Sequence, residues 1–303
     1  MSRKIVLLAS TGQVGFELNR QLQSFGEVVT VTRENVNFLD LEAVYQYINK
    51  ISPDIIVNAA AYTAVDKAES DIASTFTLNR DLPRVLAELS IVHDAWLVHY
   101  SSDYVYPGNG DTSWIESDAP GPLNVYGQSK LEGDLAIESI ASKYLIFRTS
   151  WVYAARGNNF LLSMLRLGKE RDSLNIVNDQ IGAPTPASLI ATVSTLCLQK
   201  VISLDSAQSF SGVYHLASRG HTNWYDFASK IFDEARIRGL SLALKKGGLG
   251  QISSTEYPTP AKRPQNSRLN LDKIESKFGV IMPTWESQLS LTMEEWLDAN
   301  GSV

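Results

Sequence analysis

The first 26 residues contain a strand, a glycine turn and a helix in that order. Residues 4–9 read Lys-Ile-Val-Leu-Leu-Ala, a run typical of a parallel strand that is buried on both faces. The turn at 10–15 follows at once, and apolar residues then recur at helical spacing from Gly15 until Gly26. Such a unit presents bare backbone amides at a helix N-terminus, which suits a dinucleotide pyrophosphate. We therefore expect Gly12, Gln13 and Val14 to contact a cofactor, the alternative being an ordinary tight turn.

Strands and helices continue to alternate through roughly the first 150 residues. Beyond the opening unit, the pattern predicts strands at 28–31, 54–58, 96–100 and 144–147 and helices at 41–50 and 72–93. This βαβ repetition predicts an α/β fold with a Rossmann-type, doubly wound parallel sheet and right-handed crossovers. Ligands bind such sheets beyond the carboxyl ends of the strands. The residues that follow each strand are therefore the candidates for a site.

The regular alternation loosens after residue 150. Helical patterns remain at 158–169, 188–198 and 224–236, and extended ones at 174–177 and 213–216. Residues 257–264 contain three prolines within seven positions, which excludes a regular helix or a central strand. We expect a dinucleotide-binding domain at 1–152, with about 174–210 crossing back to it, and a smaller, mainly substrate-binding domain at 153–303.

Residues after the predicted strands provide the other candidate cofactor contacts: Thr32, Arg33, Asp40, Leu41, Ala61, Tyr62, Thr63 and Tyr100. An acidic residue at the end of the second strand normally bonds the adenosine ribose 2′-hydroxyl and repels a 2′-phosphate. Here that strand ends Val31-Thr32-Arg33, and a hydroxyl beside a guanidinium suits the phosphate. We expect NADPH or NADH as the cofactor, with NADPH used at least as well as NADH. The opening turn departs from its usual three-glycine pattern, because Ala9 replaces the first glycine.

A phenol and an ammonium stand four residues apart at Tyr126 and Lys130, on one face of a predicted helix. Of the 12 tyrosines, only Tyr126 is followed four positions later by lysine. A free phenol has a pKa near 10, and a neighbouring ammonium would favour the phenolate and bring that pKa towards the working range. The pair predicts a proton-transfer site, to which Ser102, after the fourth strand, adds a hydroxyl. Alternatively, Ser102 and Asp103 only stabilise a turn.

Composition excludes several classes of protein. The 303-residue chain is 44% hydrophobic, which supports a substantial core, and its net charge of −6 gives no basic field for a nucleic-acid backbone. Its single cysteine, Cys197, lies in an apolar helical stretch and cannot form an internal disulfide. The sequence shows no signal peptide and no apolar run near the roughly 20 residues of a membrane span. We expect a cytoplasmic protein with no nucleic-acid and no membrane partner.

Several segments together resemble the dTDP-4-dehydrorhamnose reductases of the extended short-chain dehydrogenase/reductase superfamily: residues 11–15, 57–69, 102–105, 124–127, 147–153, 178–185 and 260–270. They include Thr-Gly-Gln-Val-Gly at 11–15, Asn-Val-Tyr-Gly at 124–127 and Asn-Asp-Gln-Ile-Gly-Ala-Pro-Thr at 178–185. The similarity extends over nearly the whole chain.

The resemblance implies reduction of the C4 ketone of dTDP-4-dehydro-L-rhamnose to dTDP-L-rhamnose, in the biosynthesis of cell-surface polysaccharide. It implies that Tyr126 supplies a proton, that Ser102 bonds the ketone oxygen, and that Lys130 tunes Tyr126 and bonds the nicotinamide ribose. The implied substrate contacts are Ser102, Asp103, Trp151 and Arg263. Of these, Trp151 would face the sugar or base, and Arg263 the diphosphate.

Other interpretations stay open. Trp151 could pack in the core, and Arg263 could be a surface charge. A nucleotide-sugar epimerase uses the same serine, tyrosine and lysine, and a reductase for another 4-keto sugar would look alike. A non-catalytic, NADP-binding regulatory subunit could share the fold. A dehydratase is disfavoured, because Tyr104 replaces the second acid that such enzymes carry after the fourth strand.

We expect no metal site. The four histidines show no metal-ligand spacing. Some members of the family that the chain resembles are described as dimers bridged by a metal ion between acidic side chains. Glu17 fits one such position, but the helix after the Gly-Ala-Pro-Thr block begins without a carboxylate, whereas Mg²⁺ usually takes at least one or two. We therefore expect a monomer or a weak homodimer.

Overall fold

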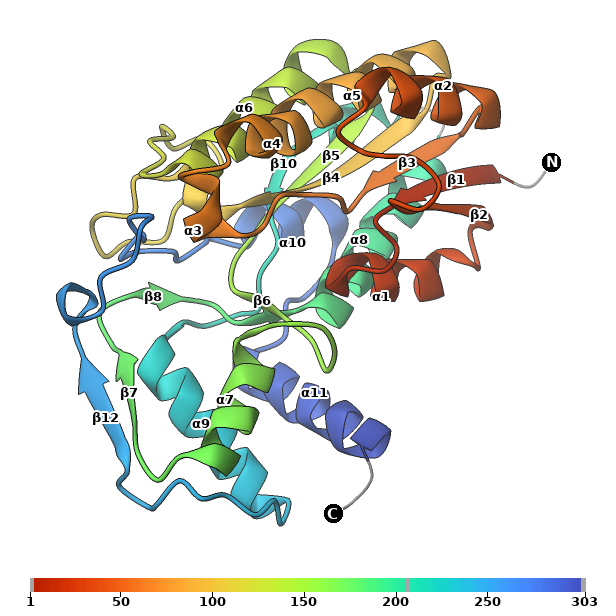
Figure 1. Cartoon of the computed structure of the whole chain (residues 1–303). Coiled ribbons are helices and arrows are strands. Elements are labelled where there is room, and N and C mark those ends of the chain that lie inside the picture. The colour runs from red at the N-terminus through yellow and green to blue at the C-terminus, as the bar shows by residue number, and fades with distance from the viewer. Residues whose placement is uncertain (1–2, 205–206, 301–303) are drawn as a thin grey trace.

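A six-stranded sheet forms the centre of the larger lobe of the molecule (Figure 1). In this computed structural model, which describes residues 3–204 and 207–300, the strand order is β2-β1-β3-β4-β5-β10. The strands are β1 (Arg3–Leu8), β2 (Gly26–Val31), β3 (Ile55–Asn58), β4 (Trp96–Ser102), β5 (Tyr144–Thr149) and β10 (Gly212–His215). Every pairing between them is parallel. The predicted α/β fold with a Rossmann-type sheet is confirmed.

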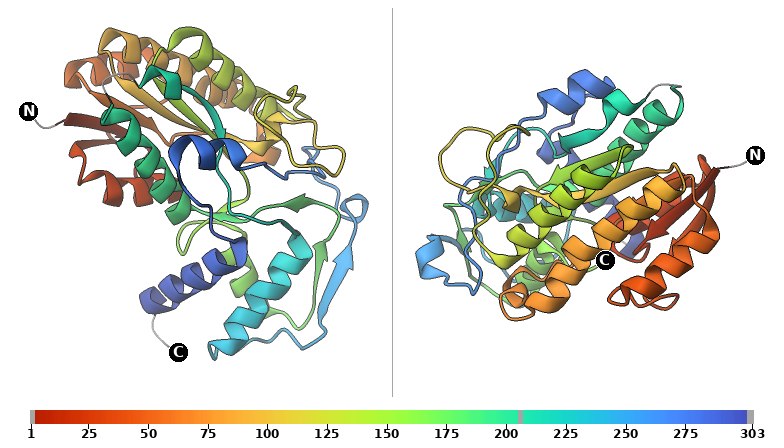
Figure 2. Two further views of the ribbon diagram at one scale, coloured as in Figure 1. Left: turned by 180° about the vertical axis from the view of Figure 1, so that it is seen from behind. Right: turned by 90° about the horizontal axis from the view of Figure 1, so that it is seen from above.

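Helices cover both faces of this sheet (Figure 2). One face carries α2 (Leu41–Ile51), α5 (Leu82–Val92) and α6 (Val125–Ile140), and the other α1 (Gln13–Leu22), α8 (Ala187–Ile202) and α10 (Asp272–Phe278). Successive residues of β1 enter opposite cores: Ile5 and Leu7 pack with α1 and α8, whereas Val6 and Leu8 pack with α2 and α5. Because both faces are covered, the strand is continuously apolar instead of alternating.

The order of the strands places a crevice at one edge of the sheet. The chain passes from β1 to β2 on one side and then crosses to β3 on the other side of β1. Such a reversal separates the loops that leave neighbouring strands, and ligands bind between them at the carboxyl ends. The glycine turn after β1 and the loop after β3 both lie at this reversal.

The smaller lobe, below the sheet in Figure 1, comes from segments after residue 152. Its elements are α7 (Phe160–Glu170), β7 (Leu174–Val177), α9 (Trp224–Ile237), β12 (Leu249–Ile252) and α11 (Trp285–Asn300). They enclose a separate core that includes Leu161, Phe227 and Leu289. Within the predicted crossing segment 174–210, α8 returns to pack on α1, whereas β7 pairs with β12 in the smaller lobe. Residues 1–2, 205–206 and 301–303 of the predicted domains lie outside the described residues.

Short elements complete the chain. Two small sheets pair β6 (Val152–Tyr153) with β9 (Thr185–Pro186) and β8 (Ile181–Gly182) with β11 (Thr222–Asn223). The short helices are α3 (Val65–Ala68), α4 (Ile72–Phe76), η1 (Thr77–Asp81), η2 (Asp103–Val105), η3 (Gln208–Phe210) and η4 (Ser254–Glu256). Among the described residues, no helix has the length and apolar character needed to cross a bilayer.

The single helix predicted at 72–93 is wrong, because a π-helical turn interrupts it. The segment divides into α4, the π-helix η1 and α5. Pro83 lies in the first turn of α5 and cannot donate a hydrogen bond to the carbonyl of Asn79. That carbonyl instead lies against Gly133 of α6, where a β-carbon would come within 2.0 Å of it. The proline-rich segment 257–264 contains no helix or strand, as predicted.

Candidate active site

The turn between β1 and α1 is tight and leaves the N-terminus of the helix without a side-chain cap. Ala9 adopts a left-handed conformation with a φ of 57°, so the turn accommodates its β-carbon at the cost of backbone strain. A β-carbon on Gly15 would come within 2.1 Å of the Ala9 carbonyl oxygen, so only glycine lets α1 start this close to the strand. Gly12 caps α1 in an extended conformation without a side-chain hydrogen bond. No capping side chain therefore occupies the first amides of α1, which belong to Gln13 and Val14. Such amides are suited to bind a pyrophosphate.

The residues predicted to face the adenosine end lie after β2 and at the start of α2. Thr32 donates its hydroxyl to Asn35 Oδ1 at 3.0 Å, so that hydroxyl already holds a turn. The Arg33 side chain is exposed and free to meet a 2′-phosphate. Asp40 accepts a hydrogen bond from an amide in the first turn of α2 and acts as its N-cap. Leu41 packs partly against the core.

The loop after β3 is bound to α6 by Asn79, a side chain that the sequence did not single out. Asn79 accepts from the amide of Tyr62 at 2.8 Å and donates to its carbonyl at 3.1 Å, as a neighbouring strand would. Its amide also donates to the Ser129 hydroxyl on α6 at 3.0 Å. Ala61 and Tyr62 are half-buried beside this contact, and Thr63 is exposed. The π-helical turn η1 brings Asn79 to this position.

The end of β4 and the first turn of α6 bring Ser102 and Tyr126 together. The Ser102 hydroxyl is buried and donates to Asp103 Oδ1 at 3.0 Å. Burial raises the pKa of Tyr126 to about 12, and a hydrogen bond with Ser102 opposes that rise. The predicted lowering of this pKa by Lys130 is absent, because burial dominates. Tyr126 is therefore a neutral phenol at neutral pH, a form that carries a proton to give. Burial also raises the pKa of Asp103 to about 6.

Lys130 is fully buried, and its ammonium position is set by β4. Its Nζ donates to the Tyr100 carbonyl at 2.6 Å and lies 3.2 Å from His99 Nε2. Burial lowers the pKa of Lys130 to about 8, while Asp134 opposes the shift. The Tyr100 side chain itself lies in the core beside Phe147. Tyr100 thus reaches the site through its carbonyl, and its predicted contact with a cofactor stays a prediction.

Trp151, which follows β5, has a strained backbone, and its indole is packed between two other residues. Its φ of 47° is left-handed, which is rare for a bulky residue. The indole stacks on Trp224 with ring centroids 3.5 Å apart and planes 8° from parallel. On its other side a β-carbon at Gly182 would come within 2.5 Å of the ring. The indole lies between Gly182 and Trp224 and is half-buried, so that part of Trp151 packs against these residues and part of it remains exposed.

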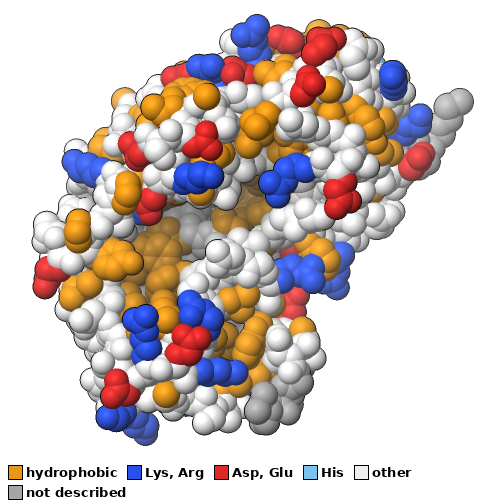
Figure 3. Space-filling view, in the orientation of Figure 1, with side chains coloured by type: hydrophobic (Ala, Val, Ile, Leu, Met, Phe, Trp, Pro, Cys, Tyr) orange, Lys and Arg blue, Asp and Glu red, His pale blue; other side chains and the backbone are white. Residues whose placement is uncertain are grey.

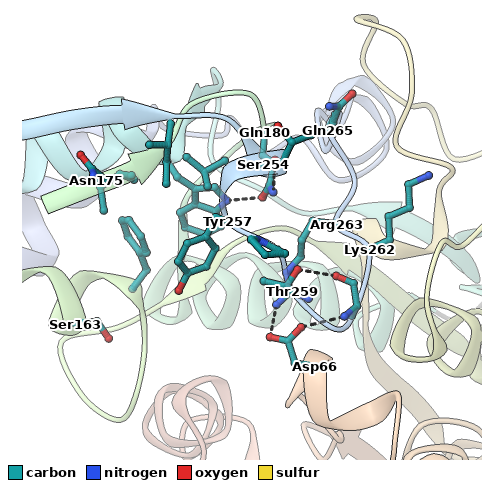
Figure 4. Close-up of a pocket in the computed structure, with 18 of the residues that line it drawn as sticks. Asp66, Ser163, Asn175, Gln180, Ser254, Tyr257, Thr259, Lys262, Arg263 and Gln265 are labelled. Carbon is teal, nitrogen blue, oxygen red and sulfur yellow. Dashed lines mark hydrogen bonds and ion pairs between the residues drawn. The ribbon is translucent and has the colours of Figure 1, made fainter.

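Arg263 lines a cavity of about 1430 Å³ between the two lobes (Figure 4). Its Nη2 forms an ion pair with Asp66 of α3 at 2.7 Å. Its Nη1 is buried without a partner among the described residues. A buried guanidinium nitrogen with no acceptor is costly unless a ligand supplies one. An oxygen of a bound phosphate would be such an acceptor for Nη1 of Arg263.

The same cavity comes close to Tyr126, which is not one of its lining residues. Its wall includes Tyr104, whose ring packs edge-on against Tyr126 at 5.4 Å. Apolar side chains of α7, such as Phe160 and Met164, line the wall of the smaller lobe. Figure 3 shows the hollow between the lobes, with hydrophobic side chains gathered around it. The sequence alone did not indicate Phe160 or Met164, because their spacing is that of any amphipathic helix.

The described residues contain no group of three or more histidine, cysteine or acidic side chains that could hold a metal ion. Glu17 of α1 is buried, and its pKa is raised by burial and then by Glu295 of α11. Arg20 and Arg156 oppose this shift. No local pattern associates Glu295 with Glu17, because the two lie in helices far apart in the chain.

Known proteins resemble this chain along its whole length. The family model described as RmlD substrate binding domain matches residues 3–297. The dTDP-4-dehydrorhamnose reductase of Shigella flexneri is 45% identical over 295 residues, covering 96% of this chain and 97% of the relative. That of Escherichia coli K12 is equally similar over the same shares.

A solved structure extends the similarity to the fold. The dTDP-4-dehydrorhamnose reductase of Bacillus anthracis in complex with NADP is 31% identical and has a TM-score of 0.88. The alignment covers 97% of this chain and 100% of that one. The turn after β1, the Ser102 and Tyr126 pair and the lining of the cavity lie within the matched residues. The chain belongs to the dTDP-4-dehydrorhamnose reductase family.

Proposed function

We propose that this protein reduces the C4 ketone of dTDP-4-dehydro-L-rhamnose to dTDP-L-rhamnose with NADPH or NADH, as a step in cell-surface polysaccharide biosynthesis. One observation carries the proposal. The Tyr126 phenol, which its raised pKa keeps neutral, packs against Tyr104 in the wall of a cavity where Arg263 has a guanidinium nitrogen without a partner among the described residues. A ketone near the phenol and a diphosphate near the guanidinium use both features. Family membership supports the same substrate.

The chemistry assigned to the protein is proton donation. A nicotinamide dinucleotide, when bound, supplies the hydride that converts the carbonyl carbon into an alkoxide carbon. Tyr126 gives its phenolic proton to the carbonyl oxygen, and Ser102 donates a hydrogen bond to the same atom as charge develops. Lys130, next to the ribose site, favours the phenolate that Tyr126 becomes when it gives up its proton. The phenolate then regains a proton from solvent. The raised pKa of Tyr126 keeps its proton in place before reaction.

The two lobes divide the binding work. We assign the dinucleotide to the larger lobe, where Gly12, Gln13 and Val14 face the pyrophosphate and Arg33 the adenosine ribose. The sugar nucleotide belongs in the cavity, with Asp103, Trp151 and Arg263 as contacts. The predicted domains at 1–152 and 153–303 follow this division, except that α8, β10 and α10 support the sheet. We also propose that the protein acts in the cytoplasm, as a monomer or weak homodimer.

A turnover assay with product analysis tests the proposal. Purified protein, NADPH and dTDP-4-dehydro-L-rhamnose should consume one reduced cofactor per sugar, and NMR of the product should identify dTDP-L-rhamnose. Other dTDP-4-keto sugars serve as comparison substrates. An altered sugar without net cofactor consumption would indicate an epimerase. Cofactor binding without any turnover would indicate a regulatory subunit, and either result would overturn the proposal.

A further inference from the structure

A side chain from the smaller lobe contacts the glycine turn of the larger lobe. Asn159, the N-cap of α7, donates from Nδ2 to Oε1 of Gln13 at 2.8 Å. Gln13 is the first residue of α1, so its side chain starts where the proposed pyrophosphate site lies. The two residues are 146 positions apart, and both are partly buried. The contact therefore connects the proposed cofactor site with the lobe that we assign mainly to the substrate.

The backbone of the smaller lobe fixes which end of the Asn159 amide faces Gln13. Asn159 Oδ1 accepts from the amide of Leu162 at 3.1 Å, in the first turn of α7. Its Nδ2 donates to the carbonyls of Ala154 at 2.9 Å and Arg156 at 3.0 Å. A backbone amide only donates and a carbonyl only accepts, so rotating the Asn159 amide by half a turn would break all three bonds. Nδ2 must therefore be the atom that faces Gln13.

The direction of the Asn159 amide in turn sets the direction of the Gln13 amide. An NH₂ group only donates, so the atom of Gln13 that faces it must accept, and that atom is Oε1. The NH₂ group of Gln13, at Nε2, is the other arm of the same planar amide, and it has no hydrogen-bond partner among the described residues. Gln13 thus keeps two N–H donors for a ligand at the N-terminus of α1.

The loop that carries Asn159 is packed on α1 by two further contacts. Gly157 has a φ of 76°, and a β-carbon there would come 3.2 Å from Cγ of Gln13. A larger residue would be strained by this backbone and would press on the Gln13 side chain. The guanidinium of Arg156 lies over the ring of Phe16, with Cζ 3.2 Å from the ring centroid. These contacts keep the loop beside the turn, where Asn159 reaches the Gln13 amide.

We propose that Asn159 is a positioning residue of the cofactor site, which orients the Gln13 amide so that its Nε2 hydrogens donate to a dinucleotide pyrophosphate. The backbone amides of the first turn of α1 and this NH₂ group then bind the same anion. A hydrogen bond to an ionised phosphate oxygen is stronger than one to a neutral acceptor. The inference rests on the dinucleotide binding of the proposed function and does not depend on the identity of the sugar.

The alternative is that Asn159 only caps α7. The variant Asn159→Ser separates the two roles, because serine is an equally good N-cap but has no NH₂ group to reach Gln13. Helix α7, which carries Phe160 and Met164 to the cavity wall, should therefore stay in place in this variant. Circular dichroism and the melting temperature check that the fold is kept.

Affinity for NADPH, measured by fluorescence titration, tests the orientation. Gln13→Met removes the donor and should raise Kd by about tenfold or more, the effect of one hydrogen bond to a charged group. Asn159→Ser keeps the donor but lets the Gln13 amide rotate, and it should raise Kd by about threefold to tenfold. In turnover, Asn159→Ser should change KM for NADPH more than kcat. Asn158→Ala, at the exposed neighbouring position, is the matched control and should keep the wild-type Kd.

The double variant Gln13→Met/Asn159→Ser shows whether the two side chains act together. If Asn159 acts through Gln13, the double variant should bind NADPH no more weakly than Gln13→Met alone. Additive losses, or a wild-type Kd for Asn159→Ser, would overturn the inference. All variants should bind 2′-AMP as the wild type does, because this probe carries the adenosine end without a pyrophosphate. A parallel loss of 2′-AMP affinity would mean that the variants distort the whole cofactor lobe, and would also overturn it.

The donor can be observed in the wild-type protein as well. The ¹⁵N signal of the Gln13 side-chain amide, assigned by its absence in Gln13→Met, should move when NADPH binds and stay in place with 2′-AMP. Bound NADPH without this shift would overturn the inference alone, even if Asn159→Ser does not fold. A wild type that binds neither NADPH nor NADH would overturn the proposed function together with it.

Discussion

Arg263 and Asp66, 197 positions apart in the chain, form a 2.7 Å ion pair in the wall of the cavity between the lobes. Asp66 also accepts from the amide of Ala261 at 3.2 Å, so one carboxylate holds both the guanidinium and the backbone of the proline-rich segment. The prolines around Arg263 restrict that backbone further. Together these contacts orient the guanidinium, whose buried Nη1 has no partner among the described residues.

Replacing Arg263 should weaken recognition of the sugar nucleotide. A charged hydrogen bond contributes about 1.5 to 3 kcal/mol, so Arg263→Ala should lower kcat/KM for the dTDP-sugar by roughly tenfold to a hundredfold. Affinity for NADPH, measured by fluorescence titration, should not change. Arg263→Lys should recover part of the loss. Asp66→Asn is the matched control, because it keeps the guanidinium but loosens its orientation, and its effect should be smaller. Equal kcat/KM values for Arg263→Ala and wild type would exclude the phosphate contact.

Removing the phenolic hydroxyl should abolish proton donation without altering the fold. Tyr126→Phe should reduce kcat by a factor of 10² or more, because a positioned general acid contributes about that much. Cofactor affinity should stay within about twofold of wild type, since the hydroxyl acts at the transition state. Stopped-flow single-turnover rates provide the measurement. A variant that retains more than about a tenth of kcat would show that another group donates the proton.

The exposed guanidinium of Arg33 should decide the choice of cofactor. Thr32 uses its hydroxyl to hold Asn35, so we expect Arg33 to make the stronger contact with a 2′-phosphate. The wild type should use NADPH at least as well as NADH. Arg33→Ala should raise KM for NADPH by about tenfold or more, the value of one charged hydrogen bond, and leave KM for NADH unchanged. A clear preference of the wild type for NADH in kcat/KM would contradict this assignment.

Chelation should affect neither activity nor assembly. Glu17 and Glu295 lie near each other, but Arg20 and Arg156 already act on Glu17, and Arg20 approaches it to 3.8 Å. A pair of carboxylates compensated by two guanidiniums attracts a divalent cation weakly. Turnover and sedimentation velocity with EDTA should match those with Mg²⁺. A loss on chelation that Mg²⁺ alone restores would reveal ligands beyond this pair.

The stability of the fold should depend on pH through His215, which is fully buried on β10. Its Nδ1 donates to the Asn270 carbonyl at 3.0 Å, and its Nε2 accepts from the Tyr106 hydroxyl at 2.7 Å. Burial, and then Arg148, lower the pKa of His215 to about 3. The pKa of His215 in the folded protein is thus lower than the pKa of a histidine in the unfolded chain. The neutral imidazole therefore contributes fully to the free energy of unfolding above about pH 6.5, and this contribution is lost as the pH falls towards 3.

The variant His215→Gln isolates this contribution. Each pH unit within the window removes about 1.4 kcal/mol from the free energy of unfolding of the wild type. The variant should be less stable at pH 7 but should lose about 2 kcal/mol less than wild type between about pH 6.5 and pH 5. Urea unfolding at several pH values measures the difference. Parallel curves for the two proteins would mean that His215 does not remain neutral in the folded state.

Local patterns were enough to predict the sheet and to single out Tyr126 as the candidate proton donor. The apolar run of β1, the glycine turn and the helix that follows involve residues close together in the chain, and their preferences agree. Tyr126 and Ser102 were identified in the same way, from a helical spacing and from the end of a strand. Lys130 shows where such reasoning ends. Its spacing from Tyr126 is correct, but its Nζ binds the Tyr100 carbonyl on a strand that only the fold brings near.

By itself, the sequence determined the order of strands and helices, the nucleotide-binding turn and the family, because these depend on neighbouring residues or on whole-length similarity. Only the tertiary structure decided which groups meet. It joined Asp66 to Arg263 and Asn79 to Tyr62, brought the charge of Glu295 towards Glu17, and aligned Asn58 with His99 and Lys130. It also decided protonation, since the pKa of Tyr126 rises and that of Lys130 falls through burial. Burial depends on every segment packed around a group, and no local pattern contains that information.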